Sequence, residues 1–259
     1  MRLAIAGKGG VGKTTISATL SRLAARSGWS VLAIDGDSNP NLGTALGVEP
    51  TAGHESFLPT SLVSYRPGGP ALSRPVDEVI DAHASVGRDA VRLVRMGAPE
   101  HADEGCLCSA HAMVSAVLAD LGGREQLLTV IDLEASPEHL SRGTARHADV
   151  LLIITEPYYR SLETARRLAA LAQELTIPRI AVVANKVRSP LDEEGLREFC
   201  DRHALEYVAT IPWSDAVIDA DGRRSRVLDD VPDDPAVVAV AALADQLLGS
   251  LAETTEASR

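Results

Sequence analysis

The residue types best suited to chemistry lie near the start of the chain, in the glycine-rich stretch GKGGVGKTT at residues 7–15. Glycines let successive backbone N–H groups converge on a polyphosphate, and a helix that follows adds the partial positive charge of its N-terminus. We expect Lys13 to reach the β- and γ-phosphates of a nucleotide and the Thr14 hydroxyl to ligate Mg²⁺. The expected nucleotide-binding residues of this loop are Gly9, Gly10, Val11, Gly12, Lys13, Thr14 and Thr15.

The segments on either side of this stretch are those that a phosphate-binding loop requires. The apolar run at residues 3–6 reads as a buried strand, and residues 16–26 carry Ile16, Leu20 and Leu23 at the spacing of one helix face. A strand, a glycine-rich loop and a helix in this order predict a P-loop nucleotide site.

A second interpretation of the same glycines stays open. Gly7, Gly9 and Gly12 also satisfy the dinucleotide fingerprint, and Asp35 ends the next apolar run, near where a ribose-binding acid belongs. Lys13 and Thr14 favour the triphosphate, because a dinucleotide turn needs neither a lysine nor a hydroxyl aimed at phosphate and metal. A nicotinamide or flavin oxidoreductase is therefore the alternative, and an NTPase is the prediction.

Polar residues follow several of the expected strands, where ligands bind in open α/β sheets. Asp132 ends the apolar run 127–131, the Walker-B position, where a carboxylate holds Mg²⁺ directly or through water. Asp37 follows the second strand and is the candidate that orients the attacking water, with Asp35 and Asn41 as supporting residues. An acid at a strand end can also simply form a turn or cap a helix.

The remaining periodicity predicts strands alternating with helices. The expected strands are residues 3–6, 30–35, 90–96, 127–133, 150–155, 179–184 and 207–211, and the expected helices are 16–26, 76–84, 110–121, 162–175, 191–203 and 236–251. We predict an α/β fold of the P-loop NTPase type, a mostly parallel twisted sheet with helices on both faces, forming a single domain over residues 1–259. Residues 51–75 are expected to be irregular, and the tail from Glu253 to Arg259 is expected to fray.

Composition and net charge limit the kinds of partner and the cellular compartment that we expect for this protein. Hydrophobic residues make up 45% and charged residues 24%, as in a soluble globular protein, and the net charge of −11 argues against a nucleic-acid partner. The sequence has no apolar run long enough for a membrane span, and it begins in a core strand without room for a signal peptide. Three cysteines form no disulfide framework, so we expect a cytoplasmic protein.

Lys8 is an extra lysine within the loop, and with it the chain resembles the MinD/ParA/nitrogenase-iron-protein class of deviant Walker-A ATPases. The resemblance implies that ATP is sandwiched between two subunits and that Lys8 reaches across to the partner's phosphates. It also implies that Asn185 recognises the base, with Pro212 and Trp213 beside the adenine. Asn185 could instead cap a turn.

Cys106 and Cys108 are the second chemical feature. Two nearby cysteines are often small buried apolar groups. Two thiolates do not complete a metal site, but two copies across a two-fold axis supply four sulfurs, which suits Zn²⁺ or Ni²⁺. His101 and His111 flank the pair and are expected at the surface, and Cys200 is expected to pack under a helix.

The segment from Ile131 to Thr144, IDLEASPEHLSRGT, together with the cysteine pair resembles the CooC-type ATPases. These serve nickel insertion into carbon monoxide dehydrogenase and carry a Cys-x-Cys metal site at their dimer interface. The resemblance implies a homodimeric ATPase that uses ATP/ADP and Mg²⁺, binds Ni²⁺ or Zn²⁺, and serves a client enzyme, with no nucleic-acid or membrane partner. An ATP-switched scaffold of the MinD/ParA type without metal delivery is the other alternative.

Overall fold

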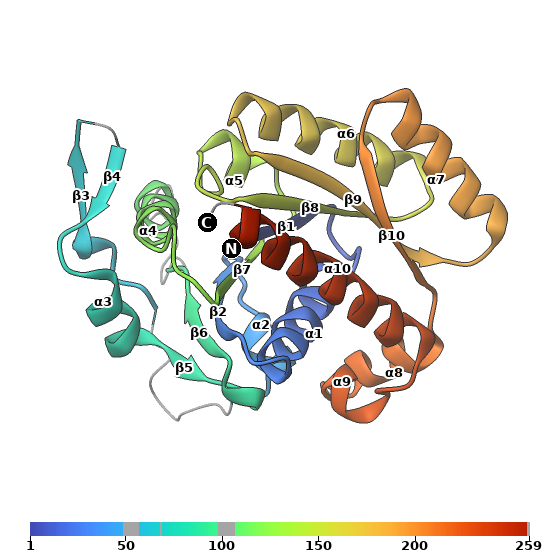
Figure 1. Ribbon diagram of the computed structural model, residues 1–259, viewed down its shortest axis with the longest axis horizontal. Coiled ribbons are helices and arrows are strands. Elements are labelled where there is room, and N and C mark those ends of the chain that lie inside the picture. The colour runs from blue at the N-terminus through green and yellow to red at the C-terminus, as the bar shows by residue number, and fades with distance from the viewer. Residues whose placement is uncertain (49–56, 68, 98–106, 258–259) are drawn as a thin grey trace.

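The computed structural model describes residues 1–48, 57–67, 69–97 and 107–257, with side chains described as far as residue 249. Its centre is an eight-stranded sheet in the order β10-β9-β8-β1-β7-β2-β6-β5, and every pairing is parallel except β5 with β6 (Figure 1). The strands are β1 (Arg2–Gly7), β2 (Ser30–Gly36), β5 (Ser85–Val86), β6 (Arg92–Arg95), β7 (Leu127–Leu133), β8 (Val150–Thr155), β9 (Arg179–Val187) and β10 (Glu206–Pro212).

Helices follow most of these strands. They are α1 (Lys13–Arg26), α2 (Leu42–Ala45), α3 (Val76–His83), α4 (Cys108–Asp120), α5 (Glu138–Ser141), α6 (Tyr159–Glu174), α7 (Pro190–Arg202), α8 (Asp215–Gly222), α9 (Val227–Asp230) and α10 (Pro235–Ala257), with 3₁₀ turns η1 (Thr60–Leu62) and η2 (Arg88–Ala90). Among the described residues, no helix combines the length and the apolar character needed to cross a bilayer.

Both faces of the sheet are buried, which is why its strands read as continuous apolar runs. On β1, Leu3 and Ile5 pack into the core under α1, α2 and α10, while Ala4 and Ala6 join the opposite core under α3, α4, α6 and α7. The prediction of an α/β P-loop fold with helices on both faces is confirmed.

The strand order brings the predicted site residues together at the carboxyl ends of neighbouring strands. β1 lies between β7 and β8, and β7 also pairs with β2, so the carboxyl ends of β1, β2 and β7 are neighbours. Asp35 on β2 and Asp132 on β7 are register partners at this edge. The loop after β1 therefore faces the polar ends of its neighbours, the usual ligand position in such sheets.

Three segments differ from the sequence prediction. Residues 63–72, expected to be irregular, form the antiparallel hairpin of β3 (Val63–Arg66) and β4 (Gly69–Leu72), which packs against α4 because Leu72 and Val63 join the apolar core there. The strand expected at 90–96 is shortened to Arg92–Arg95 because the left-handed backbone of Asp89 and Ala90 in η2 precedes it. Helix α10 continues to Ala257, past the point where the tail was expected to fray.

Candidate nucleotide site

The loop between β1 and α1 depends on glycine at two positions. A Cβ on Gly7 would lie 2.3 Å from the Ile154 carbonyl oxygen, so β1 and β8 approach too closely for any side chain there. Gly12 has φ +92° and caps α1, and a Cβ on it would lie 2.5 Å from Asn185 Nδ2. The loop therefore folds back against β9 only with glycine at position 12.

The N-terminus of α1 points its backbone donors into the loop. Gly12 provides no side-chain cap, so the N–H groups of the first turn are available to an anion. Lys13 is buried, and its Nζ lies 3.4 Å from the Lys8 carbonyl oxygen. Burial lowers the pKa of Lys13, while the charge of Asp132 opposes this effect. Amides and an ammonium group that share one pocket suit a polyphosphate.

Thr14 and Asp132 meet at the edge of this pocket. Thr14 Oγ1 donates to Asp132 Oδ2 at 2.6 Å, and Ser17 Oγ donates to Oδ1 at 3.2 Å. Burial raises the pKa of Asp132 to about 7. A hydroxyl and a buried carboxylate in contact are oxygen ligands of the kind Mg²⁺ takes, and a bound cation would favour the ionised carboxylate. The donor set therefore fits Mg²⁺.

The loop after β2 is held by Asp35. This carboxylate is fully buried and accepts the backbone N–H of Leu42 at 2.8 Å and that of Asp37 at 3.3 Å. Asp37 Oδ1 in turn accepts the N–H of Asn39 at 2.8 Å, and Asn41 Nδ2 donates to the Asn39 carbonyl at 2.7 Å. Asp37 and Asn41 line the cavity over the loop, whereas Asp35 supports them from beneath.

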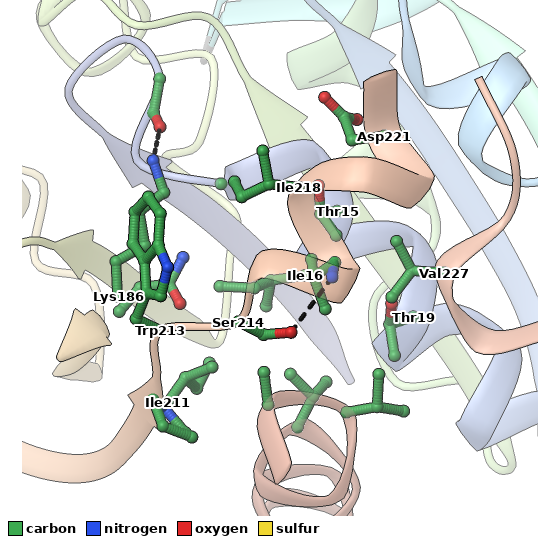
Figure 2. A pocket seen from close by; sticks show the side chains of 18 residues that line it. Thr15, Ile16, Thr19, Lys186, Ile211, Trp213, Ser214, Ile218, Asp221 and Val227 are labelled. Carbon is green, nitrogen blue, oxygen red and sulfur yellow. Dashed lines mark hydrogen bonds between the residues drawn. The ribbon is translucent and has the colours of Figure 1, made fainter. Parts of the chain in front are cut away.

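Two adjoining cavities meet over the loop. The polar one has a volume of about 650 Å³ and is lined by residues 9–10 and 12–15, Asp37 and Asn41. The smaller, largely apolar one has a volume of about 130 Å³ and is lined by Asn185, Pro212 and Trp213 together with side chains of α1, α8 and α10 (Figure 2). The expected phosphate residues and the expected base residues therefore lie in neighbouring parts of one depression.

Asn185, at the end of β9, is tied to the loop. Its Nδ2 donates to the Val11 carbonyl at 2.7 Å, and the side chain is 8% exposed. Trp213 is held by an Nε1 hydrogen bond to Asp215 at 2.9 Å and by the Arg188 guanidinium, which stacks 3.7 Å from the ring centroid. These contacts fix both groups at the mouth of the smaller cavity.

Lys186 follows an expected strand, as do the other polar residues predicted to face the loop, but the sequence assigned it no role in the site. Its Nζ donates to the Gly10 carbonyl at 2.6 Å (Figure 2). It also donates to Glu156 Oε1 at 2.9 Å, so the loop is fastened to the ends of β8 and β9. A compositional signal was present. The sequence has only three lysines, and all its other Lys/Arg positions are arginine. Two of the three, Lys8 and Lys13, belong to the phosphate loop, so the third, Lys186, could have been singled out as well.

Lys8 points away from its own loop. Its Nζ lies 3.4 Å from the Tyr158 hydroxyl and 5.6 Å from the centroid of that ring, beyond the end of β8. Lys13, by contrast, stays within the loop. The side chains of Lys8 and Lys13 therefore point in different directions, Lys8 toward Tyr158 and Lys13 into the loop.

Cys106 and His101 lie outside the described residues. Cys108 is the first residue of α4, is disulfide-bonded, and its Sγ lies 2.9 Å from Arg142 Nη1. Among the described residues, no group of three or more histidine, cysteine or acidic side chains could hold a metal ion. Cys200 is a buried residue of α7 and packs in the core, as expected.

The expectation that His111 lies at the surface is wrong. His111 is 4% exposed, because α4 is apolar on almost every side and leaves no polar face for it. Its Nδ1 lies 3.0 Å from Thr144 Oγ1, and its ring packs edge-on against His139. His111 is thus a hydrogen-bonded core residue.

Comparison with known proteins agrees with this geometry. Residues 3–227 match the CobQ/CobB/MinD/ParA nucleotide binding domain family. The carbon monoxide dehydrogenase accessory protein CooC of Rhodospirillum rubrum is 37% identical over 85% of this chain and 87% of its own length. An uncharacterized ATP-binding protein of Methanocaldococcus jannaschii is 35% identical over 84% of this chain and 87% of its own.

Solved structures share the fold. The septum site-determining protein MinD of Pyrococcus horikoshii, solved with Mg-ADP, superposes with a TM-score of 0.73 at 18% identity over 95% of both chains. The cell division ATPase MinD of Pyrococcus furiosus gives 0.73 at 20% identity over 96% of this chain and 98% of that one. The chain therefore belongs to the CobQ/CobB/MinD/ParA nucleotide-binding family, and it is an ATPase.

Proposed function

We propose that this ATPase forms a homodimer over ATP and couples hydrolysis to the binding and release of a Ni²⁺ or Zn²⁺ ion, in the maturation of a nickel enzyme. Carbon monoxide dehydrogenase is the client suggested by the 37% identity to CooC. The metal is cargo, held by Cys106 and Cys108 of two subunits, and ATP and Mg²⁺ occupy the site built on the loop at residues 7–15.

One contact carries the proposal. Arg142 Nη1 lies 2.9 Å from Cys108 Sγ, and Arg142 belongs to the segment that follows Asp132 out of the nucleotide site. A guanidinium donor stabilises negative charge on a reduced sulfur. A shift of this segment on hydrolysis would therefore alter the surroundings of the cysteine. Since Cys108 is disulfide-bonded in the structure, the metal-binding form is the reduced one.

In the proposed ATP site, the residues that line the cavity have separate roles in binding and hydrolysis. Lys13 and the backbone amides of α1 hold the phosphates, Thr14 and Asp132 hold Mg²⁺, and Asp37 positions the attacking water. Mg²⁺ supplies charge neutralisation on the phosphates when it is bound. Asn185, Pro212 and Trp213 receive the base. Lys8, directed outward to Tyr158, is free of its own loop and reaches the phosphates of the partner subunit, so turnover depends on dimerisation.

Metal and nucleotide titrations on the reduced protein test this function. We expect one Ni²⁺ or Zn²⁺ per dimer, with ATP and metal altering each other's affinity by the same factor. The Cys106→Ser/Cys108→Ser variant should lose the metal and keep ATP, while Cys200→Ala serves as the cysteine control. Unchanged metal stoichiometry in the double variant would contradict metal delivery and leave an ATP-switched scaffold.

The trans role of Lys8 has its own test. Lys8→Ala should bind ATP but lose turnover and the ATP-dependent dimer, measured by phosphate release and by light scattering. Normal turnover in Lys8→Ala would remove the trans lysine from the proposal.

A further inference from the structure

His139 is a buried histidine on α5 that the proposed site does not use. Its side chain is 1% exposed, and neither ring nitrogen has a hydrogen-bond partner in the part of the chain that the structure describes. Buried polar atoms are nearly always paired, and leaving one unpaired is costly. A ring of this kind can gain a hydrogen-bond partner when a neighbouring side chain changes position.

The ring lies between the end of β2 and the segment that follows β7. Its Nε2 is 3.8 Å from Glu134 Oε2, which is beyond hydrogen-bond distance. Its Cε1 approaches the end of β2, 3.6 Å from where a Cβ on Gly36 would lie. Gly36 precedes Asp37, and Glu134 lies two residues after Asp132. His139 therefore contacts the strand end before the water-positioning aspartate and faces the segment after the Walker-B aspartate.

Glu134 links these two segments. Its Oε2 accepts a hydrogen bond from Ser38 Oγ at 3.3 Å, and Ser38 is the neighbour of Asp37. The Glu134 side chain is 35% exposed and can change its rotamer. A movement of about 1 Å toward His139 would bring its carboxylate within hydrogen-bond distance of Nε2. The position of the Ser38 loop then depends on which partner holds Glu134.

The opposite side of the ring is fixed. His111 packs against it with ring centroids 4.4 Å apart at 85°, and Thr144 holds His111 in turn. Burial lowers the pKa of His139 to about 3, with the neighbouring His111 acting in the same direction. The imidazole is thus neutral and offers one N–H from a rigid position.

We propose that His139 is a positioning residue for ATP hydrolysis: its neutral ring donates from Nε2 to Glu134 in the closed, nucleotide-bound site and thereby sets the loop that carries Asp37. The inference rests on the proposed role of Asp37 as the water-positioning residue. It explains why a buried position keeps a polar ring that is unpaired when the site is open.

Substitution of His139 by an aromatic ring or by a side-chain amide tests this positioning role. His139→Phe keeps the ring and removes the donor, so kcat should fall by about 10- to 100-fold, the loss expected for a hydrogen bond to a charged group, while ATP affinity and ATP-dependent dimerisation stay unchanged. Removing unpaired polar atoms should leave the Tm equal or higher. A purely packing role predicts the same Tm but no change in kcat.

The amide variants identify the nitrogen. His139→Gln places an amide N–H near Nε2 and should restore part of kcat, whereas His139→Asn mimics Nδ1 and should not. This comparison stays informative if His139→Phe folds poorly. His203→Phe, a surface histidine on Phe199, is the matched control.

Asp37→Ala separates the two proposals. If Asp37→Ala turns over normally, the proposed hydrolytic site fails. If Asp37→Ala loses turnover but His139→Phe retains wild-type kcat, or if Asn rescues as well as Gln, the positioning role of His139 is overturned.

Discussion

Asp35 and Asp132 are register partners on the neighbouring parallel strands β2 and β7, and both carboxyl groups are buried at the edge of the sheet that meets the phosphate loop. Burial raises the pKa of Asp35 to about 6 and that of Asp132 to about 7, and the charge of Asp35 contributes to the second shift. A cation bound beside these two carboxyl groups would favour their ionised forms.

The first prediction concerns stability against pH. An unfolded aspartate titrates near 3.8, so these native carboxyls hold protons that the unfolded chain releases. Their contribution to stability is complete below about pH 4 and is lost as the pH rises through about 6 and 7. In EDTA, the Tm should therefore fall between about pH 4 and pH 7. Asp132→Asn should flatten this decline, as should saturating Mg²⁺ and ATP, and parallel curves for variant and wild type would contradict the assignment.

The second prediction concerns Gly12. Gly12→Ala places a methyl group 2.5 Å from Asn185 Nδ2 at φ +92°, so it should displace Asn185 from Val11 and abolish ATP binding in calorimetry. Gly28→Ala is the control, because Gly28 has φ +89° with open space around it. Both variants should lose about 1–2 kcal/mol from backbone strain, but only Gly12→Ala should lose ATP. Equal ATP affinity in the two variants would argue against the clash.

The third prediction concerns the base. Asn185 Nδ2 donates to the Val11 carbonyl. The side-chain oxygen of Asn185 can therefore accept a hydrogen bond from the exocyclic amine of adenine. Asn185→Ala should weaken ATP binding about 10-fold and should reduce the preference for ATP over GTP, measured by competition with a fluorescent nucleotide. Asn41→Ala, which changes an exposed asparagine of the adjoining polar cavity, should keep the preference. Undiminished discrimination in Asn185→Ala would assign Asn185 to loop support alone.

The fourth prediction concerns Arg22, which is 2% exposed and bridges Asp89 at 2.7 Å and Asp229 at 2.6 Å. Arg22→Met leaves two carboxylates without their buried partner and should cost about 3–5 kcal/mol in denaturant unfolding. Arg26→Met removes a 44% exposed arginine from the same two acids and should cost less than about 1 kcal/mol. Similar losses for both variants would mean that burial does not set the strength of this cluster.

The phosphate loop and the sheet could be predicted because they follow from short-range rules. Glycine spacing, a lysine and a hydroxyl define residues 7–15, and continuous apolar runs define the buried strands. The positions of Asp132 and Asp37 beside the loop were predicted the same way, from their place at the ends of such runs. These signals lie within about ten residues of the groups they concern.

The remaining features depend on contacts between distant segments. Lys186 reaches Gly10 because β9 ends beside the loop, and this placement is a property of the strand order. His111 is buried because its partners, Thr144 and His139, come from beyond β7. The β3–β4 hairpin is stabilised by α4 rather than by its own sequence. No local pattern carries such information.

The three lysines of the sequence all lie in or against the phosphate loop: Lys8 and Lys13 belong to it, and Lys186 contacts it from β9. An amine-acylating reagent has only these ammonium groups and the α-amino group of Met1 as targets, and Met1 donates to the Leu127 carbonyl at 2.8 Å. Mass spectrometry of the labelled protein therefore reads occupancy of the nucleotide pocket almost without background. Under the proposed function, labelling of Lys8 would report subunit pairing and labelling of Lys13 would report phosphate binding, in one sample.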